Sequence, residues 1–172
     1  MPRIHVCSLA RLPRAIAETG ADHVLSLMSE DVARPAAIAP GRHLYIKVSD
    51  IVAPMEGTTL PMDAHIRQAL DFVRGWDRAK PMIVHCWAGV SRSTASAFIA
   101  ACALRPDLDE GHLARLIRER SPTATPNPRF VALADAMLGR EGRMIAAVEA
   151  IGRGADCYEG EPFHLDLGPS GP

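Results

Sequence analysis

The stretch "HCWAGVSRST", residues 85–94, carries residue types that could act on a phosphate group. Cys86 directly follows an apolar run, and Arg92 comes six positions later. Gly89 permits a positive φ between them, so the chain can curl with its backbone N–H groups pointing inward, and the helix that starts near Arg92 adds free N–H groups of its own. The planar guanidinium of Arg92 can bind two oxygens of an anion at once. The predicted phosphate-binding loop is Trp87, Ala88, Gly89, Val90, Ser91 and Arg92.

Cys86 is the predicted nucleophile of this loop. Helix N-termini and nearby cations lower the pKa of a cysteine thiol from about 8.5 to between about 3.5 and 7.5. We therefore expect Cys86 to be a thiolate, ready for in-line attack on phosphorus. Ser93 is placed to donate its hydroxyl to the sulfur and to help it leave when the phosphocysteine is hydrolysed. The side chain of His85 points to the other face of the strand, so we expect it to brace the loop.

Displacement at phosphorus also needs a proton for the leaving oxygen. A positioned carboxylic acid typically contributes about 10²–10⁴-fold to such a step. Asp50 ends the strand-like segment "YIKVSD" and should therefore lie at the same edge of the sheet as Cys86. Glu56 and Asp63 are rivals, but Asp63 fits the first turn of the helix that follows. Asp50 is the predicted general acid.

The composition sets the class of protein. A chain of 172 residues is expected to form one ordinary domain. Its net charge of −1 does not favour binding to nucleic acid or to an anionic membrane surface. No apolar run approaches the roughly 20 residues that span a bilayer. The histidines show no ligand spacing, so we expect no metal and no cofactor. Widely spaced cysteines indicate reduced thiols and a cytoplasmic protein, although Cys86 and Cys7 could form a regulatory disulfide if their strand ends adjoin.

Hydrophobic periodicity predicts alternating strands and helices. The expected strands lie within residues 3–9, 22–29, 42–50 and 81–86, and the expected helices at 13–19, 62–76, from 92, from 107, from 128 and at 143–152. Asp107 and Glu110 resemble a capping box, and Asn127 with Pro128 resembles another helix start.

This pattern predicts an α/β fold. We expect a central, mostly parallel sheet of four to five strands with helices on both faces and the phosphate-binding loop between a strand and a helix. The ligand crevice of such a sheet lies beyond the carboxyl ends of its strands, where Cys86 sits. Residues 1–155 form the predicted catalytic domain, and residues 156–172 are a Gly/Pro-rich tail that we expect to be loosely ordered.

The motif His85-Cys86-x-x-Gly89-x-x-Arg92-Ser93 resembles the HCxxGxxR[S/T] signature of the cysteine-dependent protein tyrosine phosphatases, especially the compact dual-specificity type. An aspartate 36 residues before the cysteine resembles their general-acid loop, and "SPTATPNPRFVAL" is similar to a helix start downstream in that group. The resemblance covers residues 3–138. It implies the phosphatase fold, no metal, and the roles given above to Cys86, Arg92, Ser93 and Asp50. It also implies that Asn127 lies near the back of the site.

The predicted function is hydrolysis of a phosphomonoester, acting on phosphotyrosine in proteins or on a small phosphomonoester. A lipid, sugar or nucleic-acid-end phosphatase is an alternative, but the five residues between Cys86 and Arg92 include no lysine or arginine to attract a polyanion. A sulfur transferase of the rhodanese type would leave Asp50 without a role. A phosphate-binding pseudophosphatase is the non-enzyme alternative. The sequence leaves open the oligomeric state and the preference between phosphotyrosine and phosphoserine.

Overall fold

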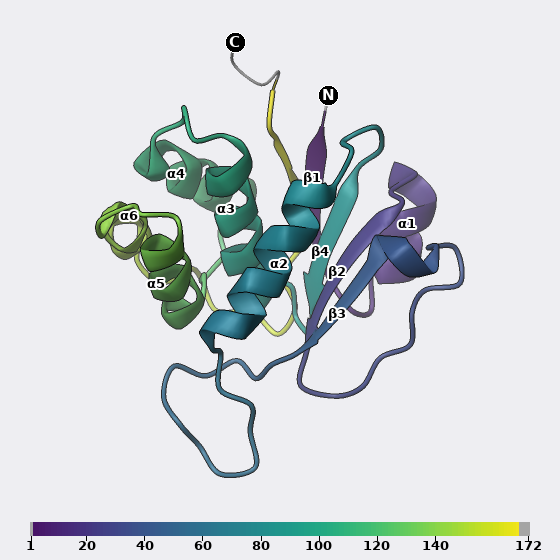
Figure 1. Ribbon diagram of the computed structural model, residues 1–172, viewed down its shortest axis with the longest axis horizontal. Helices are drawn as coiled ribbons and strands as arrows, with labels where there is room; N and C mark the ends of the chain where they lie inside the picture. Colours follow the sequence, from purple (N-terminus) through teal and green to yellow (C-terminus); the bar gives the residue numbers. More distant parts are fainter. Residues whose placement is uncertain (1, 169–172) are drawn as a thin grey trace.

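The computed structural model describes residues 2–168 and has one five-stranded sheet in the order β3-β2-β4-β1-β5 (Figure 1). The strands are β1 (Arg3–Ser8), β2 (His23–Met28), β3 (His43–Lys47), β4 (Met82–Cys86) and β5 (Phe163–Asp166). The first four run parallel to one another, and β5 pairs antiparallel with β1. The expected mostly parallel sheet is confirmed, and the carboxyl ends of its parallel strands meet at one edge.

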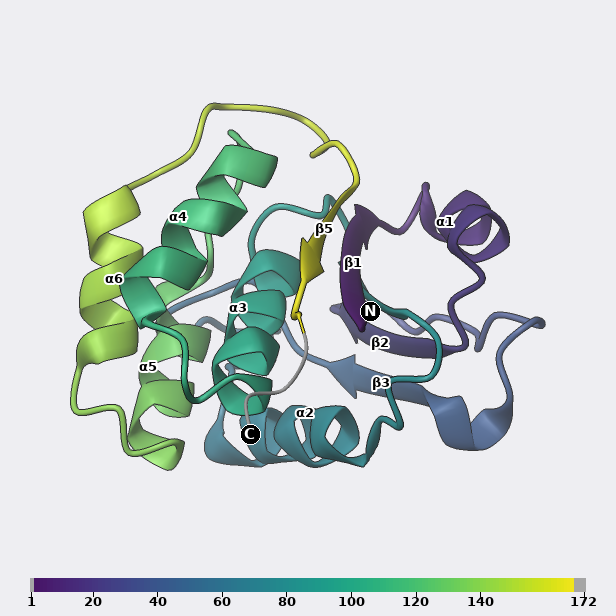
Figure 2. The ribbon, with the colours of Figure 1, turned by 90° about the horizontal axis from the view of Figure 1, so that it is seen from above.

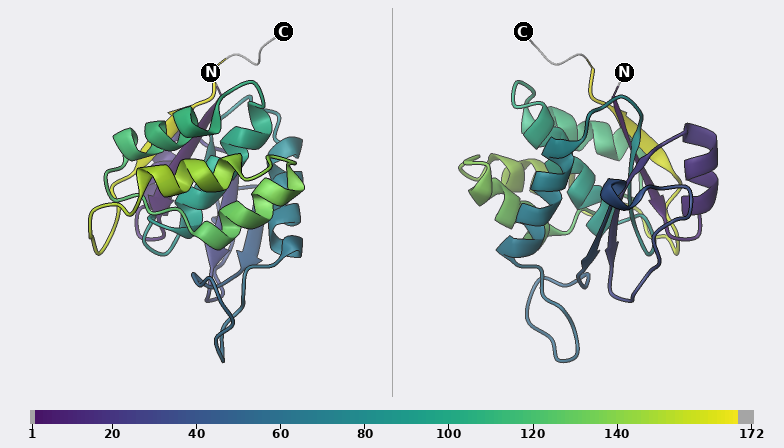
Figure 3. Two further views of the ribbon diagram at one scale, coloured as in Figure 1. Left: turned by 90° about the vertical axis from the view of Figure 1, so that its left-hand side faces the viewer. Right: turned by 45° about the vertical axis from the view of Figure 1, so that its right-hand side comes forward.

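Helices cover both faces of the sheet, as expected, but unequally. One face carries α1 (Leu12–Thr19), and the other carries α2 (Asp63–Gly75), α3 (Arg92–Leu104), α4 (Glu110–Arg120), α5 (Pro128–Met137) and α6 (Arg143–Ile151). A short 3-10 turn, η1 (Pro40–Arg42), precedes β3. Figures 2 and 3 show α1 alone on its side of the sheet and the other five helices on the opposite side. Among the described residues, no helix has both the length and the apolar character needed to cross a membrane.

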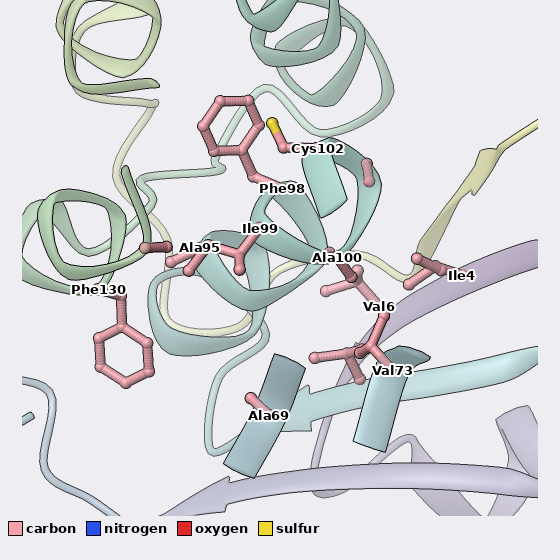
Figure 4. Packing of buried hydrophobic residues seen from close by; sticks show 14 of the residues in the cluster. Ile4, Val6, Ala69, Val73, Ala95, Phe98, Ile99, Ala100, Cys102 and Phe130 are labelled. Atoms are coloured by element: carbon pink, nitrogen blue, oxygen red, sulfur yellow. The ribbon is translucent and has the colours of Figure 1, made fainter. Parts of the chain in front are cut away.

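Helix α3 lies at the centre of the larger layer. Its sequence predicts one apolar face, yet every residue of α3 except Ala103 is at least nine-tenths buried. Seven of its thirteen residues are alanine or serine, and these small side chains let neighbouring elements approach from all sides. In Figure 4 the helix lies between Ile4 of β1, Val73 of α2 and Phe130 of α5. This packing fixes the helix whose N-terminus adjoins Cys86.

The start of α4 differs from the prediction. Asp109, not Asp107, is the N-cap, and its Oδ1 accepts a hydrogen bond from the backbone N of His112 at 2.7 Å. Asp107 instead pairs with Arg105, with Nη2 and Oδ2 2.6 Å apart. The expected partner Glu110 is buried and binds Arg140 at 2.8 Å. The carboxylate of Glu110, which a capping box would use, is therefore bound to the buried guanidinium of Arg140.

The C-terminal segment also differs from the prediction. Residues 163–166 form β5, and Phe163, Leu165 and Leu167 are buried against the helical layer. Alternation of apolar and polar residues turns one face of this short strand into the core, while the polar residues between them face away. The part of the expected loose tail that the structure describes is therefore an element of the same fold. Residues 169–172 of that tail lie outside the described residues.

Candidate active site

The loop between β4 and α3 turns its carbonyl groups outward. The carbonyl oxygen of Trp87 accepts from the N of Leu9 (3.1 Å), that of Ala88 from Gly160 (2.9 Å), and that of Val90 from Thr125 (2.9 Å). In a trans peptide the N–H points opposite to the preceding C=O, so each outward carbonyl turns the next N–H toward the centre of the loop. The result is a ring of donors above the N-terminus of α3, which is a site for an anion.

Gly89 makes the close turn of this loop possible. Its φ is +72°, a conformation that a side chain resists. A Cβ at this position would also lie 2.8 Å from the carbonyl carbon of Cys7 and 2.9 Å from the N of Ser8, both backbone atoms of β1. The loop can therefore rest against the end of β1 only because residue 89 has no side chain.

Cys86 ends β4 inside a pocket of about 280 Å³. Its Sγ lies 3.1 Å from the Oγ of Ser93, within hydrogen-bond reach, and both residues are buried. The hydroxyl of Ser93 can therefore donate to a thiolate at this position. The pocket is lined by Asp50, Cys86, Trp87, Ala88, Val90, Ser91, Arg92 and Cys157.

The guanidinium of Arg92 is held from its outer side. Its Nη1 donates to the carbonyl oxygen of Val48 at 2.9 Å and to the Oγ of Ser29 at 3.1 Å, at the ends of β3 and β2. Its Nε is buried and has no hydrogen-bond partner in the part of the chain that the structure describes. A buried donor without a partner costs about 1–3 kcal/mol. An anion in the adjoining pocket would supply the missing acceptor.

Asp50 lies at the rim of the same pocket. Its Oδ1 accepts hydrogen bonds from the Oγ of Ser91 (2.7 Å) and from the Nδ2 of Asn127 (2.8 Å). Asn127 is also the N-cap of α5, as its position before Pro128 predicts, because its Oδ1 accepts from the backbone N of Arg129 (2.9 Å). Asn127 thus joins the start of a helix to a carboxylate at the pocket.

The two rival acids lie elsewhere. Asp63 is in the first turn of α2, where its position after the loop predicts it. Glu56 is exposed in the loop of residues 51–62, and neither of the two lines the pocket. In Figure 1 this loop extends from the carboxyl edge of the sheet beyond the end of β3. Of the three carboxylates considered, Asp50 is the one that the structure brings to Cys86 and Arg92.

Comparison with known proteins decides the fold. Neither a scan of protein-family models nor a search of curated proteins finds a match. Solved structures do match: the Cydia pomonella PTP-2 phosphatase (20% identity, TM-score 0.62, 77% of this chain and 84% of that one) and human DUSP28 (22%, 0.60, 80% and 89%). The Yvh1 phosphatase domain from Chaetomium thermophilum matches at 23% identity and a TM-score of 0.59, over 82% of this chain and 93% of that one. The chain has the dual-specificity phosphatase fold.

In this phosphatase fold, His85 lies behind the loop, away from the pocket. It is fully buried, and its Nδ1 lies 3.3 Å from the carbonyl oxygen of Cys86. A carbonyl only accepts, so Nδ1 carries the proton and Nε2 accepts from the hydroxyl of Ser26 at 2.6 Å. The Oγ of Ser26 in turn accepts from Nε2 of His43 at 2.9 Å. Burial lowers the pKa of His85 to about 4, which keeps the ring neutral and this chain of bonds intact at neutral pH.

Cys7 does not face Cys86. In the β1–β4 register Cys7 is opposite His85, and Ser8 is opposite Cys86. Neighbours in register share a face, so Cys7 packs with α1 while Cys86 faces the larger helical layer. Burial, with smaller contributions from Cys86 and Glu159, raises the pKa of Cys7 to about 12. A disulfide between Cys7 and Cys86 would require the backbone to move.

The C-terminal segment approaches the loop, a contact that was not predicted from the sequence. Gly160 binds the carbonyl of Ala88, and a Cβ there would lie 3.0 Å from the carbonyl oxygen of Gly89. Cys157 is exposed and lines the pocket of Cys86. A glycine three residues before the strand-like "FHLD" is the one local signal that a close backbone contact occurs there.

Proposed function

We propose that this chain is a cysteine-dependent phosphomonoester hydrolase of the dual-specificity type, acting on phosphorylated proteins. The observation that carries the proposal is the loop around Cys86. Its carbonyls are all engaged outward at Trp87, Ala88 and Val90, and the buried Nε of Arg92 has no acceptor in the described chain. Such a loop offers several donors and one fixed cation to a dianion at the position of a nucleophilic sulfur.

The reaction has two steps. In the first, the Cys86 thiolate attacks phosphorus, an S–P bond forms, and the P–O bond to the leaving group breaks. Asp50 gives its proton to the leaving oxygen; both of its hydrogen bonds end on Oδ1, which leaves Oδ2 to the substrate. In the second, water attacks phosphorus, Asp50 takes a proton from that water, and the S–P bond breaks. The hydroxyl of Ser93 stabilises the departing thiolate, and phosphate is released.

The surroundings favour a substrate with a single phosphate. Residues 87–91 bring no lysine or arginine to the loop, so a polyphosphorylated lipid or inositol would find no further cations there. Trp87 is 54% exposed at the rim and offers an apolar wall to a phenyl ring. Phosphotyrosine in a protein therefore fits this site better than a polyanion.

Phosphate release in EDTA tests the proposal, with p-nitrophenyl phosphate and with phosphotyrosyl and phosphoseryl peptides. Cys86→Ser should abolish release from every substrate. Asp50→Asn should lower kcat on a phosphotyrosyl peptide by about 10²–10⁴-fold. The loss should be smaller on p-nitrophenyl phosphate, because p-nitrophenolate leaves without a proton.

Asp63→Asn is the matched control, since Asp63 belongs to the first turn of α2. It should leave all rates near those of the wild type. A folded wild-type chain that binds phosphotyrosyl peptides and releases no phosphate would instead be a phosphate-binding module.

A further inference from the structure

A second hollow adjoins the pocket of Cys86. It measures about 210 Å³ and is lined by Leu9, Ala10, Trp87, Ala88, Tyr158 and Glu159. Trp87 and Ala88 also line the catalytic pocket, so the two cavities share a wall. A group that is joined to a phosphate bound at Cys86 and extends past Trp87 would therefore lie next to this hollow.

The walls of the hollow expose large apolar side chains. Tyr158 is 89% exposed and Trp87 is 54% exposed. The other large apolar side chains that the described residues expose are Val52, Met55 and Met62, all in the loop that follows Asp50. Of these side chains, Tyr158 and Trp87 lie together in one lining, and Trp87 also borders the catalytic pocket. Concentration at one place marks a binding surface, whereas scattered exposure would carry no meaning.

The hollow is held in shape by the protein itself. Leu9 N binds the carbonyl of Trp87, and Gly160 N binds that of Ala88, so both walls are tied to the phosphate-binding loop. Glu159 is the charged residue of the lining; its carboxylate accepts from the hydroxyl of Ser8 and lies 3.5 Å from the Nε of Arg11. Its charge is therefore compensated, and the remaining lining favours an uncharged, apolar occupant.

We propose that this hollow is a specificity subsite, which binds a large apolar side chain close in sequence to the phosphorylated residue of a protein substrate. The inference rests on the proposed phosphatase function and names its substrate class more narrowly. The surface charge favours a protein over a membrane lipid. None of the described residues that line the hollow is a lysine or arginine, and the neighbouring Arg11 is paired with Glu159 and lies 3.9 Å from Glu161, so the lining offers little attraction to an anionic bilayer.

The test compares phosphotyrosyl peptides that carry leucine or alanine at each of three positions before and after the phosphotyrosine. With the full chain, leucine at one of these positions should raise kcat/KM about tenfold over alanine, equivalent to about 1.4 kcal/mol. Tyr158→Ser removes one wall, and Ala10→Glu places a charge in the lining. Each should reduce that preference to about twofold or less. Turnover of p-nitrophenyl phosphate, which is too small to reach the hollow, is the internal reference for folding and catalysis.

Ala146→Glu is the matched control, because Ala146 is an exposed residue of α6. It should retain the leucine preference of the wild type. A flat peptide profile, or a preference that survives both Tyr158→Ser and Ala10→Glu, overturns the subsite. So does faster turnover of a short-chain lipid phosphate than of any peptide. Failure of the wild type to hydrolyse p-nitrophenyl phosphate would instead overturn the proposed function.

Discussion

Asn127 uses the two ends of one amide for different contacts. Its oxygen caps α5, and its nitrogen donates to Oδ1 of Asp50 at 2.8 Å. Ser91, in the phosphate-binding loop, donates to the same oxygen at 2.7 Å. The carboxylate of Asp50 is thereby oriented by two elements that are separate in sequence. In the proposed mechanism Asn127 acts through Asp50, which would make it a positioning residue.

Substitution of Asn127 separates capping from positioning. Asn127→Ala should cost about 1 kcal/mol of stability, because the cap of α5 is lost. Asn127→Asp keeps the capping oxygen but sets a carboxylate against Asp50. Two facing carboxylates share one proton, so the alkaline limb of the kcat/KM profile should move to higher pH while kcat falls. Urea unfolding and a pH–rate profile measure both effects. A wild-type profile for Asn127→Asp would show that Asn127 does not orient the general acid.

At the scale of elements, local signals in the sequence predicted most of the fold. The four parallel strands are apolar runs of ordinary length, and Gly20 ends α1 with a φ of +67°, as a glycine after a helix predicts. The Cys86 loop, Arg92 and Asp50 also follow from local spacing. β5 was missed because its alternation of apolar and polar residues covers only four positions, within a segment rich in glycine and proline. The contact of Gly160 with Ala88 joins residues 72 positions apart, and no local pattern encodes it.

Gly89 tests how strictly the loop depends on its close approach to β1. Gly89→Ala places a Cβ 2.8 Å from the backbone of Cys7 at a φ of +72°. Gly20→Ala is the matched control, because its φ of +67° is similar and nothing lies within 4 Å of the added Cβ. The control should cost about 1–2 kcal/mol for the left-handed conformation and keep its activity. Gly89→Ala should cost more and lose most turnover of p-nitrophenyl phosphate. Equal effects of the two substitutions would contradict this account of the loop.

At the scale of the whole molecule, a chain of hydrogen-bonded polar side chains crosses the sheet behind the pocket of Cys86. His43 of β3, Ser26 of β2 and His85 of β4 are bonded in sequence, and His85 ends on the carbonyl of Cys86. Because Nε2 of His85 accepts a hydrogen bond from Ser26, this arrangement requires a neutral His85. The fold therefore connects the protonation of one buried ring to the stability of the molecule.

This connection predicts a loss of stability in acid. The pKa of His85 is about 4 in the folded chain and 6.5 as the reference value, so the unfolded chain binds the proton first as the pH falls. The neutral His85 ring therefore contributes on the order of 3 kcal/mol to the free energy of unfolding. This contribution is fully present above pH 6.5 and is lost as the pH falls from about 6.5 to 4. The free energy of unfolding, measured with urea at several pH values, should fall less steeply with decreasing pH in His85→Gln than in the wild type. The same substitution at His112, which is exposed on α4, should leave the slope unchanged. If His85→Gln leaves the pH dependence of the free energy of unfolding unchanged, His85 is not its cause.

The most direct measurement is to look for phosphate on Cys86 during turnover. Ser93→Ala removes the hydroxyl 3.1 Å from the sulfur, so hydrolysis of the intermediate should slow relative to its formation. Acid quenching of this variant with p-nitrophenyl phosphate, followed by mass spectrometry of its peptides, should find one phosphoryl group on the peptide that contains Cys86. The same peptide from Cys86→Ser should carry none. Steady phosphate release by Ser93→Ala without a phosphorylated Cys86, or with the phosphoryl group on another residue, would contradict the thiolate mechanism.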